Sequence, residues 1–335
     1  MTEEISWNLD TGSEPQPLVS IIIVSYNTRD ILRDCVQSIY RETTLLFEII
    51  IVDNVSHDGT PAMIRTEFPD IILLANTENY GFTKGNNQGL ARARGAYTLF
   101  LNPDTIILDH AIDRMMTTLM QNDDIVCVGP HTYNADGVTT QGTVLNIPTI
   151  SGVMHTHIPV VKILLDGLRQ WIPTLPRVRT VHEFYCETSC IVEVVKGSCM
   201  LMRTAEVRAV GGMNESLFMF SEEVELCEKL ALHFGKHIYY DRSAHIIHLG
   251  GQSMQQVSEH ATERYVESAS RYFAMRYPSS VAQAVFRWTT WFGSIWRYCA
   301  WFVVRWLRPA QRTIAQIRLA EHAVMIRWLW RHSML

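Results

Sequence analysis

The chain lacks the sequence features that mark several common classes of protein. Its seven cysteines form no C-x-x-C pair and have no zinc-ligand spacing; they stand at positions 35, 127, 186, 190, 199, 227 and 299. An odd number of unpatterned cysteines indicates reduced thiols in a cytoplasmic setting. No G-x-x-x-x-G-K-[ST] loop is present, which argues against a P-loop nucleotide site. Residues 1–17 have neither a basic stretch nor an apolar core, so we expect no signal peptide.

Acidic residues are scarce at one end of the chain. Positions 281–335 hold eight Arg and a single acid, Glu321, so this tail contributes +7 and residues 1–280 contribute −12 to the net charge of −5. An acidic body disfavours nucleic-acid binding, whereas a basic tail suits an anionic membrane surface. The 47% hydrophobic content is ample for a buried core, and 335 residues fit two modest domains or one domain with appendages.

The first hundred residues contain a regular alternation of apolar strands and amphipathic helices. We expect strands at Val19–Ser25, Phe47–Val52, Ile71–Ala75 and Tyr97–Leu101, and helices near Ile31–Tyr40, Pro61–Glu67 and Lys84–Ala93. Strand and helix repeated at this spacing predict an α/β fold, in which a mostly parallel sheet is flanked by helices on both faces. The order of the strands does not follow from the sequence.

Three of the expected strands end in polar residues that can bind a ligand. These residues are Ser25-Tyr26-Asn27, Asp53-Asn54 and Asn102-Pro103-Asp104. In open α/β sheets, ligands bind beyond the carboxyl ends of the strands, so we expect the three tips to converge on one nucleotide. Asp104 can hold Mg²⁺ or Mn²⁺ bridging phosphate oxygens. The alternatives are a turn stabilised by Asn27 and a helix near Asp109 capped by Asp104.

Two loops beyond these strands are rich in turn-forming residues. We expect Asp58 or Thr60 to cap the helix that follows them. Residues 79–89 place three Gly and three Asn, among them Asn79, Gly81 and Asn86, in one turn that leads into a helix. Loops of this kind present backbone N–H groups and the positive end of a helix to an anion, which here would be a diphosphate.

Taken together, residues Val19–Asp109 resemble the amino-terminal half of family 2 glycosyltransferases, which have the Rossmann-like GT-A fold. The likeness is in particular to the bacterial rhamnosyltransferase-like branch, in which the metal-binding acid stands in an Asn-Pro-Asp setting. The resemblance implies a divalent cation at Asp104. It also implies a nucleotide-sugar site, to which we assign Tyr26, Asn27, Asp53, Asn54, Asp58, Asn79 and Gly81 and add Asn86 and Asn102.

The second half of the chain is similar to the acceptor-side motifs of the same family. The similar segments are Gly197–Arg203, Val210–Glu215 and Phe218–Cys227. This chain has Asn214, Glu223 and Glu225 where the family has Asp. The resemblance implies that Glu223 is the base that takes the acceptor proton. The alternative is that three Glu form the solvated first turn of a helix, stabilised by its dipole.

A later segment, residues 245–253, is similar to the family's His-x-Gly-Gly-x-Ser sequence. The resemblance implies that His248 meets the metal or the diphosphate, although a histidine near a strand end more often has a structural role. Residues Pro130–Val195 look irregular and contain several prolines. We expect them to shape the acceptor side, without assigning a role to any one residue.

The tail combines tryptophan and arginine in a helical pattern. Seven of the nine Trp lie between positions 288 and 330. From Arg287 to Arg308, the apolar residues fall on one helical face and the arginines on the other. A membrane-spanning helix would bury Arg297 at a cost of about 2.5–3.5 kcal/mol. We therefore expect a helix that lies in the membrane interface, with a spanning helix or packing on the body or another subunit as alternatives.

These patterns and the resemblance together predict an inverting, metal-dependent glycosyltransferase attached to the cytoplasmic face of the plasma membrane. We expect a flexible segment at 1–17, a GT-A domain at 18–255 with donor half 18–130 and acceptor half 131–255, and a helical membrane-associating tail at 256–335. The expected reaction moves rhamnose or a similar hexose from a dTDP- or UDP-linked sugar to a lipid-linked or polysaccharide hydroxyl in cell-envelope glycan synthesis. A non-catalytic membrane scaffold with a degenerate nucleotide site, or less readily a sugar nucleotidyltransferase, is the alternative.

Overall fold

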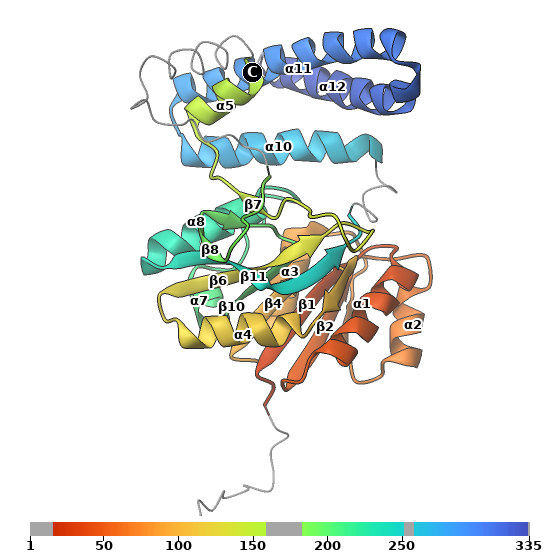
Figure 1. Cartoon of the computed structure of the whole chain (residues 1–335), viewed down its shortest axis with the longest axis vertical. Coiled ribbons are helices and arrows are strands. Elements are labelled where there is room, and N and C mark those ends of the chain that lie inside the picture. The colour runs from red at the N-terminus through yellow and green to blue at the C-terminus, as the bar shows by residue number, and fades with distance from the viewer. Residues whose placement is uncertain (1–15, 159–182, 251–257, 334–335) are drawn as a thin grey trace, which may run out of the picture.

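A single mixed sheet forms the centre of the molecule (Figure 1). The structure, a computed structural model, describes residues 16–158, 183–250 and 258–333. Within them nine strands join in the order β3-β2-β1-β4-β10-β6-β11-β5, with β8 paired to β11. They are β1 (Val19–Ser25), β2 (Phe47–Asp53), β3 (Ile72–Ala75), β4 (Tyr97–Leu101), β5 (Thr105–Leu108), β6 (Ile125–Tyr133), β8 (Cys190–Val192), β10 (Cys199–Arg203) and β11 (His237–His248).

The strand directions divide the sheet into two parts. The first four strands in sequence, β3-β2-β1-β4, are parallel as the sequence predicts. β10 then runs antiparallel to both β4 and β6, while β11 is parallel to β6 and antiparallel to β5. Because β2 and β4 lie on opposite sides of β1, the strand order reverses at β1. Such a reversal opens a crevice at the carboxyl ends of the strands, where ligands bind.

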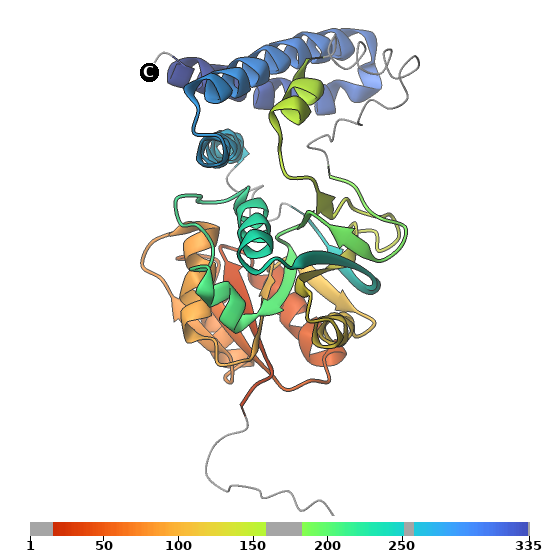
Figure 2. The same ribbon diagram turned by 90° about the vertical axis from the view of Figure 1, so that its left-hand side faces the viewer.

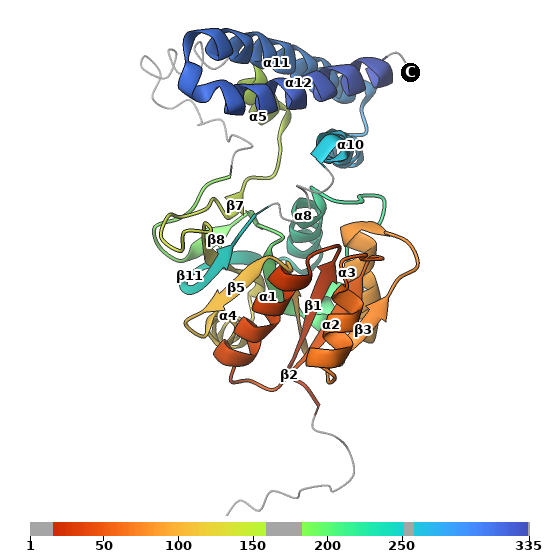
Figure 3. The same ribbon diagram turned by 90° about the vertical axis from the view of Figure 1, so that its right-hand side faces the viewer.

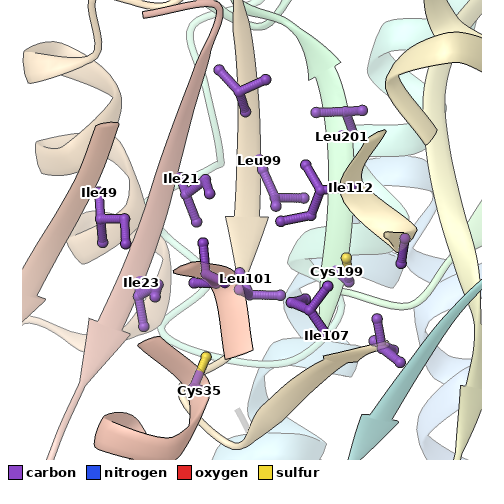
Figure 4. Packing of buried hydrophobic residues seen from close by; sticks show 14 of the residues in the cluster. Ile21, Ile23, Cys35, Ile49, Leu99, Leu101, Ile107, Ile112, Cys199 and Leu201 are labelled. Atoms are coloured by element: carbon purple, nitrogen blue, oxygen red, sulfur yellow. The ribbon is translucent and has the colours of Figure 1, made fainter. Parts of the chain in front are cut away.

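Alternate residues of the central strands are buried on opposite faces of the sheet. On β1, Ile21 and Ile23 enter one hydrophobic cluster and Ile22 enters the other. Figure 4 shows part of the first cluster, in which Cys35 and Cys199 lie among leucines and isoleucines. Helices α1 (Arg29–Glu42), α2 (Thr60–Glu67) and α4 (Ala111–Gln121) contribute to this first cluster, and α3 (Gly81–Arg92), α7 (Thr204–Ala209) and α8 (Glu222–Phe234) to the second. Burial on both faces fixes the positions of the strand ends.

The segment between the two halves is more regular than the sequence predicted. β6 runs on to Tyr133, β7 (Val144–Leu145) pairs with β9 (Val194–Val195), and helix α5 spans Ile150–His157. The Thr149 hydroxyl caps α5 by accepting a hydrogen bond from Gly152 N at 3.0 Å. Val153 packs against Phe273 and Phe286 of the tail, so tertiary contacts stabilise a helix that has little local signal.

The tail forms a helical layer above the sheet (Figures 1, 2 and 3). Its helices are α10 (Ser258–Arg276), α11 (Ser280–Leu307) and α12 (Arg312–Ser333), with a 3-10 turn η1 (Pro309–Gln311) between the last two. The amphipathic helix predicted at 287–308 is therefore one arm of a longer hairpin. In the described part of the chain, no helix has both the length and the apolar character needed to cross a bilayer.

Helix α10 joins the helical layer to the acceptor half. The Tyr272 hydroxyl donates to Glu228 Oε2 of α8 at 2.6 Å, and Arg276 forms an ion pair with the same carboxylate. The Arg264 guanidinium lies 3.6 Å from the centre of the Phe218 ring, in the loop before α8. The tail is thus attached to the loop and helix that carry Glu223.

Candidate active site

A cavity of about 1010 Å³ lies between the carboxyl end of the sheet and the helical layer. Its donor-side wall comes from the tips of β1, β2 and β4 and the start of α3, and its opposite wall from α8, α10, α11 and α12. Eight of the predicted site residues line it: Tyr26, Asn54, Asn79, Gly81, Asn102, Asp104, Glu223 and His248. Four do not appear in its lining: Asn27, Asp53, Asp58 and Asn86.

Asp104 and His248 meet in one corner of the cavity. His248 Nε2 lies 3.3 Å from Asp104 Oδ1, and both side chains are almost fully buried. The Nδ1 atom of His248 lies 2.8 Å from Gln141 Oε1. Asn102 is the third residue of this corner: its Nδ2 lies 3.4 Å from His248 Nε2, and its Oδ1 is buried with no hydrogen-bond partner in the described residues.

This corner fits a divalent cation. A carboxylate, an imidazole nitrogen and an amide oxygen are ligands that Mg²⁺ or Mn²⁺ takes, and the Gln141 contact is the kind of outer-shell hydrogen bond that orients a ligating histidine. Among the described residues, no group of three His, Cys, Asp or Glu side chains gathers at one point, so the amide oxygen and the substrate would complete the ligand set. The orphaned Asn102 oxygen is the observation that favours a cation here.

Several predicted nucleotide-site residues build the walls of the crevice with their hydrogen bonds. Asn27 Oδ1 accepts from His57 N at 2.7 Å, which joins the β1 and β2 loops. Asp58 accepts from Arg29 N at 2.8 Å and from Thr60 N at 3.0 Å, and so serves the starts of α1 and α2 together. Despite partial burial, these hydrogen bonds hold the pKa of Asp58 below its ordinary value. The side chains of Asn27 and Asp58 therefore stabilise the loops that form the walls of the crevice.

The two polar residues at the tip of β2 differ in their hydrogen bonds. Asn54 donates to Gly81 O at 3.0 Å and accepts from Asn76 Nδ2 at 2.9 Å, so its amide is already engaged. Asp53 is buried; its Oδ2 accepts from Ser56 N at 2.9 Å, while Oδ1 has no hydrogen-bond partner in the described part of the chain. An unpartnered buried carboxylate oxygen can accept a hydrogen bond from a nucleotide.

The start of α3 is closely packed against the acceptor half. Gly81 has φ +86°, and a Cβ atom there would lie 2.6 Å from the Phe218 ring. Its N–H donates to Asn79 Oδ1 at 3.0 Å, and Phe82 N donates to Phe218 O at 3.0 Å. We expected the loop at residues 79–89 to present N–H groups to a diphosphate. The N–H groups of Gly81 and Phe82 instead donate to acceptors within the protein. Asn86 lies further along α3 and is buried, with Oδ1 unpartnered among the described residues.

Glu223 lies in the first turn of α8, after two strained residues. Phe220 and Ser221 have φ of 72° and 64°, in the left-handed region that non-glycine residues rarely adopt. Gly197 lies opposite, where a Cβ atom would be 3.5 Å from Glu223 Cβ and 3.7 Å from Glu222 Oε1. The loop before α8 and the turn between β9 and β10 thus enclose the two carboxylates at the cavity wall.

The first turn of α8 is not the solvated turn that was the alternative at Glu223. Glu222 is 5% exposed, and one carboxylate oxygen of each of Glu222 and Glu223 is buried with no hydrogen-bond partner in the described residues. Burial and the charge of Glu223 raise the pKa of Glu222 well above its ordinary value. Burial also raises the pKa of Glu223, while the charge of Lys196 lowers it and that of Glu183 raises it.

Sequence reasoning missed several residues around the cavity. Lys196 forms a 2.9 Å ion pair with Glu183, and both line the cavity with Tyr265 of α10 and Arg297 of α11. Lys196 directly precedes the glycine-containing acceptor motif, and this proximity is the one signal that could have found it. Glu183 lies in the segment that we expected to shape the acceptor side without an assigned residue, whereas Tyr265 and Arg297 lie where the sequence pattern indicates only packing or membrane contact.

Comparison with known proteins identifies the first part of the chain. Residues 20–165 match the family described as Glycosyl transferase family 2. A low-salt glycan biosynthesis hexosyltransferase, Agl10 of Haloferax volcanii, is 28% identical over 213 residues, which are 62% of this chain and 60% of that protein. An N-acetylglucosaminyl-diphospho-decaprenol L-rhamnosyltransferase of Mycobacterium tuberculosis is 24% identical, over 81% of this chain and 89% of that one. The match confirms the predicted family for the matched residues.

A solved structure shares the fold across almost the whole chain. It is the mannosyltransferase PcManGT from Pyrobaculum calidifontis in complex with GDP-Man and Mn²⁺. The TM-score is 0.57 at 14% identity, and the match covers 97% of this chain and 91% of that one. The likeness confirms the predicted GT-A-like α/β fold.

Proposed function

Because residues 20–165 carry a family 2 glycosyl transferase region, we propose that the chain is an inverting, metal-dependent glycosyltransferase. It moves a hexose such as rhamnose from a nucleoside-diphosphate sugar to a hydroxyl of a lipid-linked or polysaccharide acceptor. One observation carries the proposal. A single cavity joins the Asp104–His248 corner at the carboxyl end of the sheet with the unpartnered carboxylate of Glu223.

Glu223 has the properties of a general base. Its burial raises its pKa, which makes it a stronger base than an exposed carboxylate, and no hydrogen bond among the described residues occupies Oε2. Glu223 would take the proton of the acceptor hydroxyl as that oxygen attacks the anomeric carbon and the bond to the diphosphate breaks. A single displacement of this kind inverts the configuration at the anomeric carbon.

The donor side would hold the nucleotide diphosphate against the strand ends. When bound by Asp104, His248 and Asn102, a divalent cation would neutralise charge on the leaving diphosphate. Tyr26 lines the crevice and would present its aromatic ring to the nucleoside, and Asp53 Oδ1, which lies behind the lining, has a free position for a hydrogen bond. A relative's complex with GDP-Man and Mn²⁺ supports a donor and metal of this class. We expect a dTDP- or UDP-linked sugar.

The outer face of α11 supports attachment to a membrane surface. The exposed side chains of this helix include Trp288, Phe292, Trp296, Phe302, Val303 and Trp306, and Trp296 and Trp306 are 60% and 69% exposed. The buried face is formed instead by small or polar residues such as Thr290, Gly293 and Ser294. An apolar aromatic face turned outward is typical of helices that lie in the headgroup region. We propose that residues 287–308 bind the cytoplasmic face of the plasma membrane.

The proposal is tested by following release of the nucleoside diphosphate. Detergent-solubilised protein is incubated with UDP-, dTDP- and GDP-sugars, Mg²⁺ or Mn²⁺ and a membrane-lipid extract. We expect release with one donor, dependent on added lipid and metal, and abolished in Asp104→Ala and Glu223→Gln. Asp113→Ala is the matched control for the carboxylate change, because Asp113 bonds to Thr44 on the surface far from the cavity lining.

The alternative outcome separates an enzyme from a scaffold. Saturable donor binding without release, at every donor and lipid tested, would contradict the proposed reaction and favour a non-catalytic nucleotide-binding protein. Loss of donor binding in Asp104→Ala alone would then still establish the donor site.

A further inference from the structure

The cavity continues past Glu223 into the helical layer, where its lining becomes cationic. Arg264 of α10, Arg297 of α11, and Arg318 and His322 of α12 line this part. Apolar side chains lie between them: Phe273, Phe286, Trp301 and Met325. The inner face of the tail therefore combines positive charge with an apolar wall, and neither the donor site nor the proposed base uses it.

Arg297 is held in this part of the cavity without a carboxylate partner in the described residues. Its guanidinium donates to His157 Nδ1 at 2.8 Å and to Thr156 O at 2.7 Å, both on α5. The two helices are in close contact here, because a Cβ atom on Gly293 would lie 2.7 Å from His157 Cβ. Burial lowers the pKa of Arg297 below its ordinary value. Such a site gains stability when an anion binds.

His322 adds a second unsatisfied group. Its Nδ1 atom is buried and has no hydrogen-bond partner among the described residues. Burial and the neighbouring charge of Arg297 lower the pKa of His322. Arg318 already pairs with Glu321 at 2.8 Å, so the nearest acid on α12 is engaged. A bound anion would favour protonation of the His322 imidazole, which would then donate a hydrogen bond to that anion.

Tyr265 links this region to the proposed base. It lines the same cavity, and its ring packs edge-on against Phe220, 5.6 Å away, in the loop before Glu223. Burial and the charges of Glu223 and Glu183 raise the pKa of Tyr265, whereas Arg297 lowers it. Glu223, Tyr265 and Arg297 therefore line one continuous cavity.

We propose that Arg297, with His322 and Arg264, binds the phosphate or diphosphate of a lipid-linked acceptor, so that the acceptor's sugar hydroxyl faces Glu223. This proposal rests on the proposed function, because it assigns the acceptor end of the same cavity. A phosphoryl group is the anion that Arg recognises best through its planar set of donors. The apolar outer face of α11 would place the lipid chain and this pocket at the same membrane surface.

The experiment measures binding without turnover, so that it can succeed or fail separately from the transfer reaction. Farnesyl diphosphate, inorganic pyrophosphate and farnesol are titrated against the full chain in detergent with EDTA, and intrinsic tryptophan fluorescence or calorimetry reports binding. EDTA removes cations that would hold a diphosphate at Asp104. The variants are Arg297→Gln, Arg297→Lys and, as the matched control at an exposed position of α12 outside residues 287–308, Arg312→Gln.

We expect farnesyl diphosphate to bind the wild type and Arg312→Gln equally, and to bind Arg297→Gln about tenfold to hundredfold more weakly. Arg297→Lys should recover part of the loss, which separates charge from folding. Equal binding to Arg297→Gln, or farnesol binding as tightly as the diphosphate, would overturn the proposal. Pyrophosphate binding as tightly as farnesyl diphosphate would also overturn it, because the ligand would then be a free anion.

Donor binding, measured separately with Mn²⁺ and the nucleotide, should be unchanged in Arg297→Gln. If the wild type releases nucleoside diphosphate in the transfer assay but Arg297→Gln binds farnesyl diphosphate normally, the acceptor pocket is wrong and the reaction stands.

Discussion

The donor crevice and the acceptor part of the cavity differ in the balance between bonded and unpartnered polar side chains. In the crevice, Asn27, Asn54 and Asp58 have hydrogen-bonding atoms engaged by groups of neighbouring loops, while one oxygen of Asp53 and one of Asn102 have no partner in the described residues. In the acceptor part, Glu222 and Glu223 keep buried oxygens without partners, and the half-buried Arg297 has no carboxylate partner in the part of the chain that the structure describes.

The difference indicates how each region is built. Polar residues at the strand tips hold the loops of a parallel sheet in place, so they act first on stability. Buried groups left without partners destabilise the empty protein and are kept where a substrate can satisfy them. Substitutions in the crevice should therefore lower the free energy of unfolding. Substitutions in the acceptor part should lower the rate of sugar transfer or, at Glu222, raise the stability of the folded protein.

The largest effect is expected at the base. Glu223→Gln removes proton acceptance while keeping size and hydrogen bonding, so transfer should fall by about 10²–10⁴-fold. Donor affinity and the melting temperature should change little. The measurement is the rate of nucleoside diphosphate release alongside nucleotide titration and thermal denaturation.

Glu225→Gln is the control for this change. Glu225 lies two residues after Glu223 in the same helical turn and pairs with Lys229 at 3.2 Å. It should keep most of the activity. Equal losses in both variants would mean that the helix, rather than the base, had been damaged.

In the crevice, the largest effect on stability is expected at Gly81. Gly81→Ala forces a Cβ atom against the Phe218 ring and a non-glycine residue to φ +86°, so we expect a loss of about 2–5 kcal/mol in the free energy of unfolding. Chemical denaturation measures it. The double variant with Phe218→Ala should lose less than the sum of the two single variants, because the clash is then absent. Strict additivity would show that Phe218 is not the obstacle.

Asp58→Ala should cost less than Gly81→Ala but more than an ordinary surface change. It leaves the N–H groups of Arg29 and Thr60 without their acceptor, which we expect to lower the free energy of unfolding by about 1–3 kcal/mol. The nucleotide affinity of the folded protein should remain close to that of the wild type. A large fall in affinity with no loss of stability would place Asp58 with the ligand-binding residues instead.

The sequence was sufficient for the parallel half of the fold because its signals are local. Alternation at Ile21, Ile22 and Ile23 predicts a strand buried on both faces, and the following turns carry their own capping residues. The same local patterns identified the tips that line the crevice. The orientation of α11 was only partly predictable. The spacing of its aromatic residues predicts one apolar face, whereas the inward position of Arg297 depends on its hydrogen bonds to α5.

The acceptor part was less predictable because tertiary contacts determine it. Three glutamates in one helical turn resemble a solvated helix start, and only the packing of the loop 218–221 buries Glu222. Helix α5 has a weak local pattern and is stabilised by Phe273 and Phe286 from more than a hundred residues away. The partners of Arg297 on α5 could not be found from spacing for the same reason.

The smallest effect, and the one opposite in sign, is expected at Glu222. Burial raises its pKa in the folded protein above the ordinary 4.5, so the native state binds this proton more tightly than the unfolded chain does. The resulting stability is fully present below the ordinary pKa and is lost as the pH rises through the raised folded-state pKa. Gln stays neutral at every pH, so Glu222→Gln should become more stable than the wild type as the pH rises.

A gain of about 2–4 °C in melting temperature would correspond to ~1 kcal/mol in a protein of this size. Melting temperatures measured from pH 5 to pH 9 should therefore diverge between the two proteins, while Glu225→Gln, which loses its Lys229 partner, shows no such gain. Parallel curves would mean that Glu222 keeps its proton over the whole range or finds a partner when ionised, and the contrast between the two regions would then rest on Glu223 and Arg297.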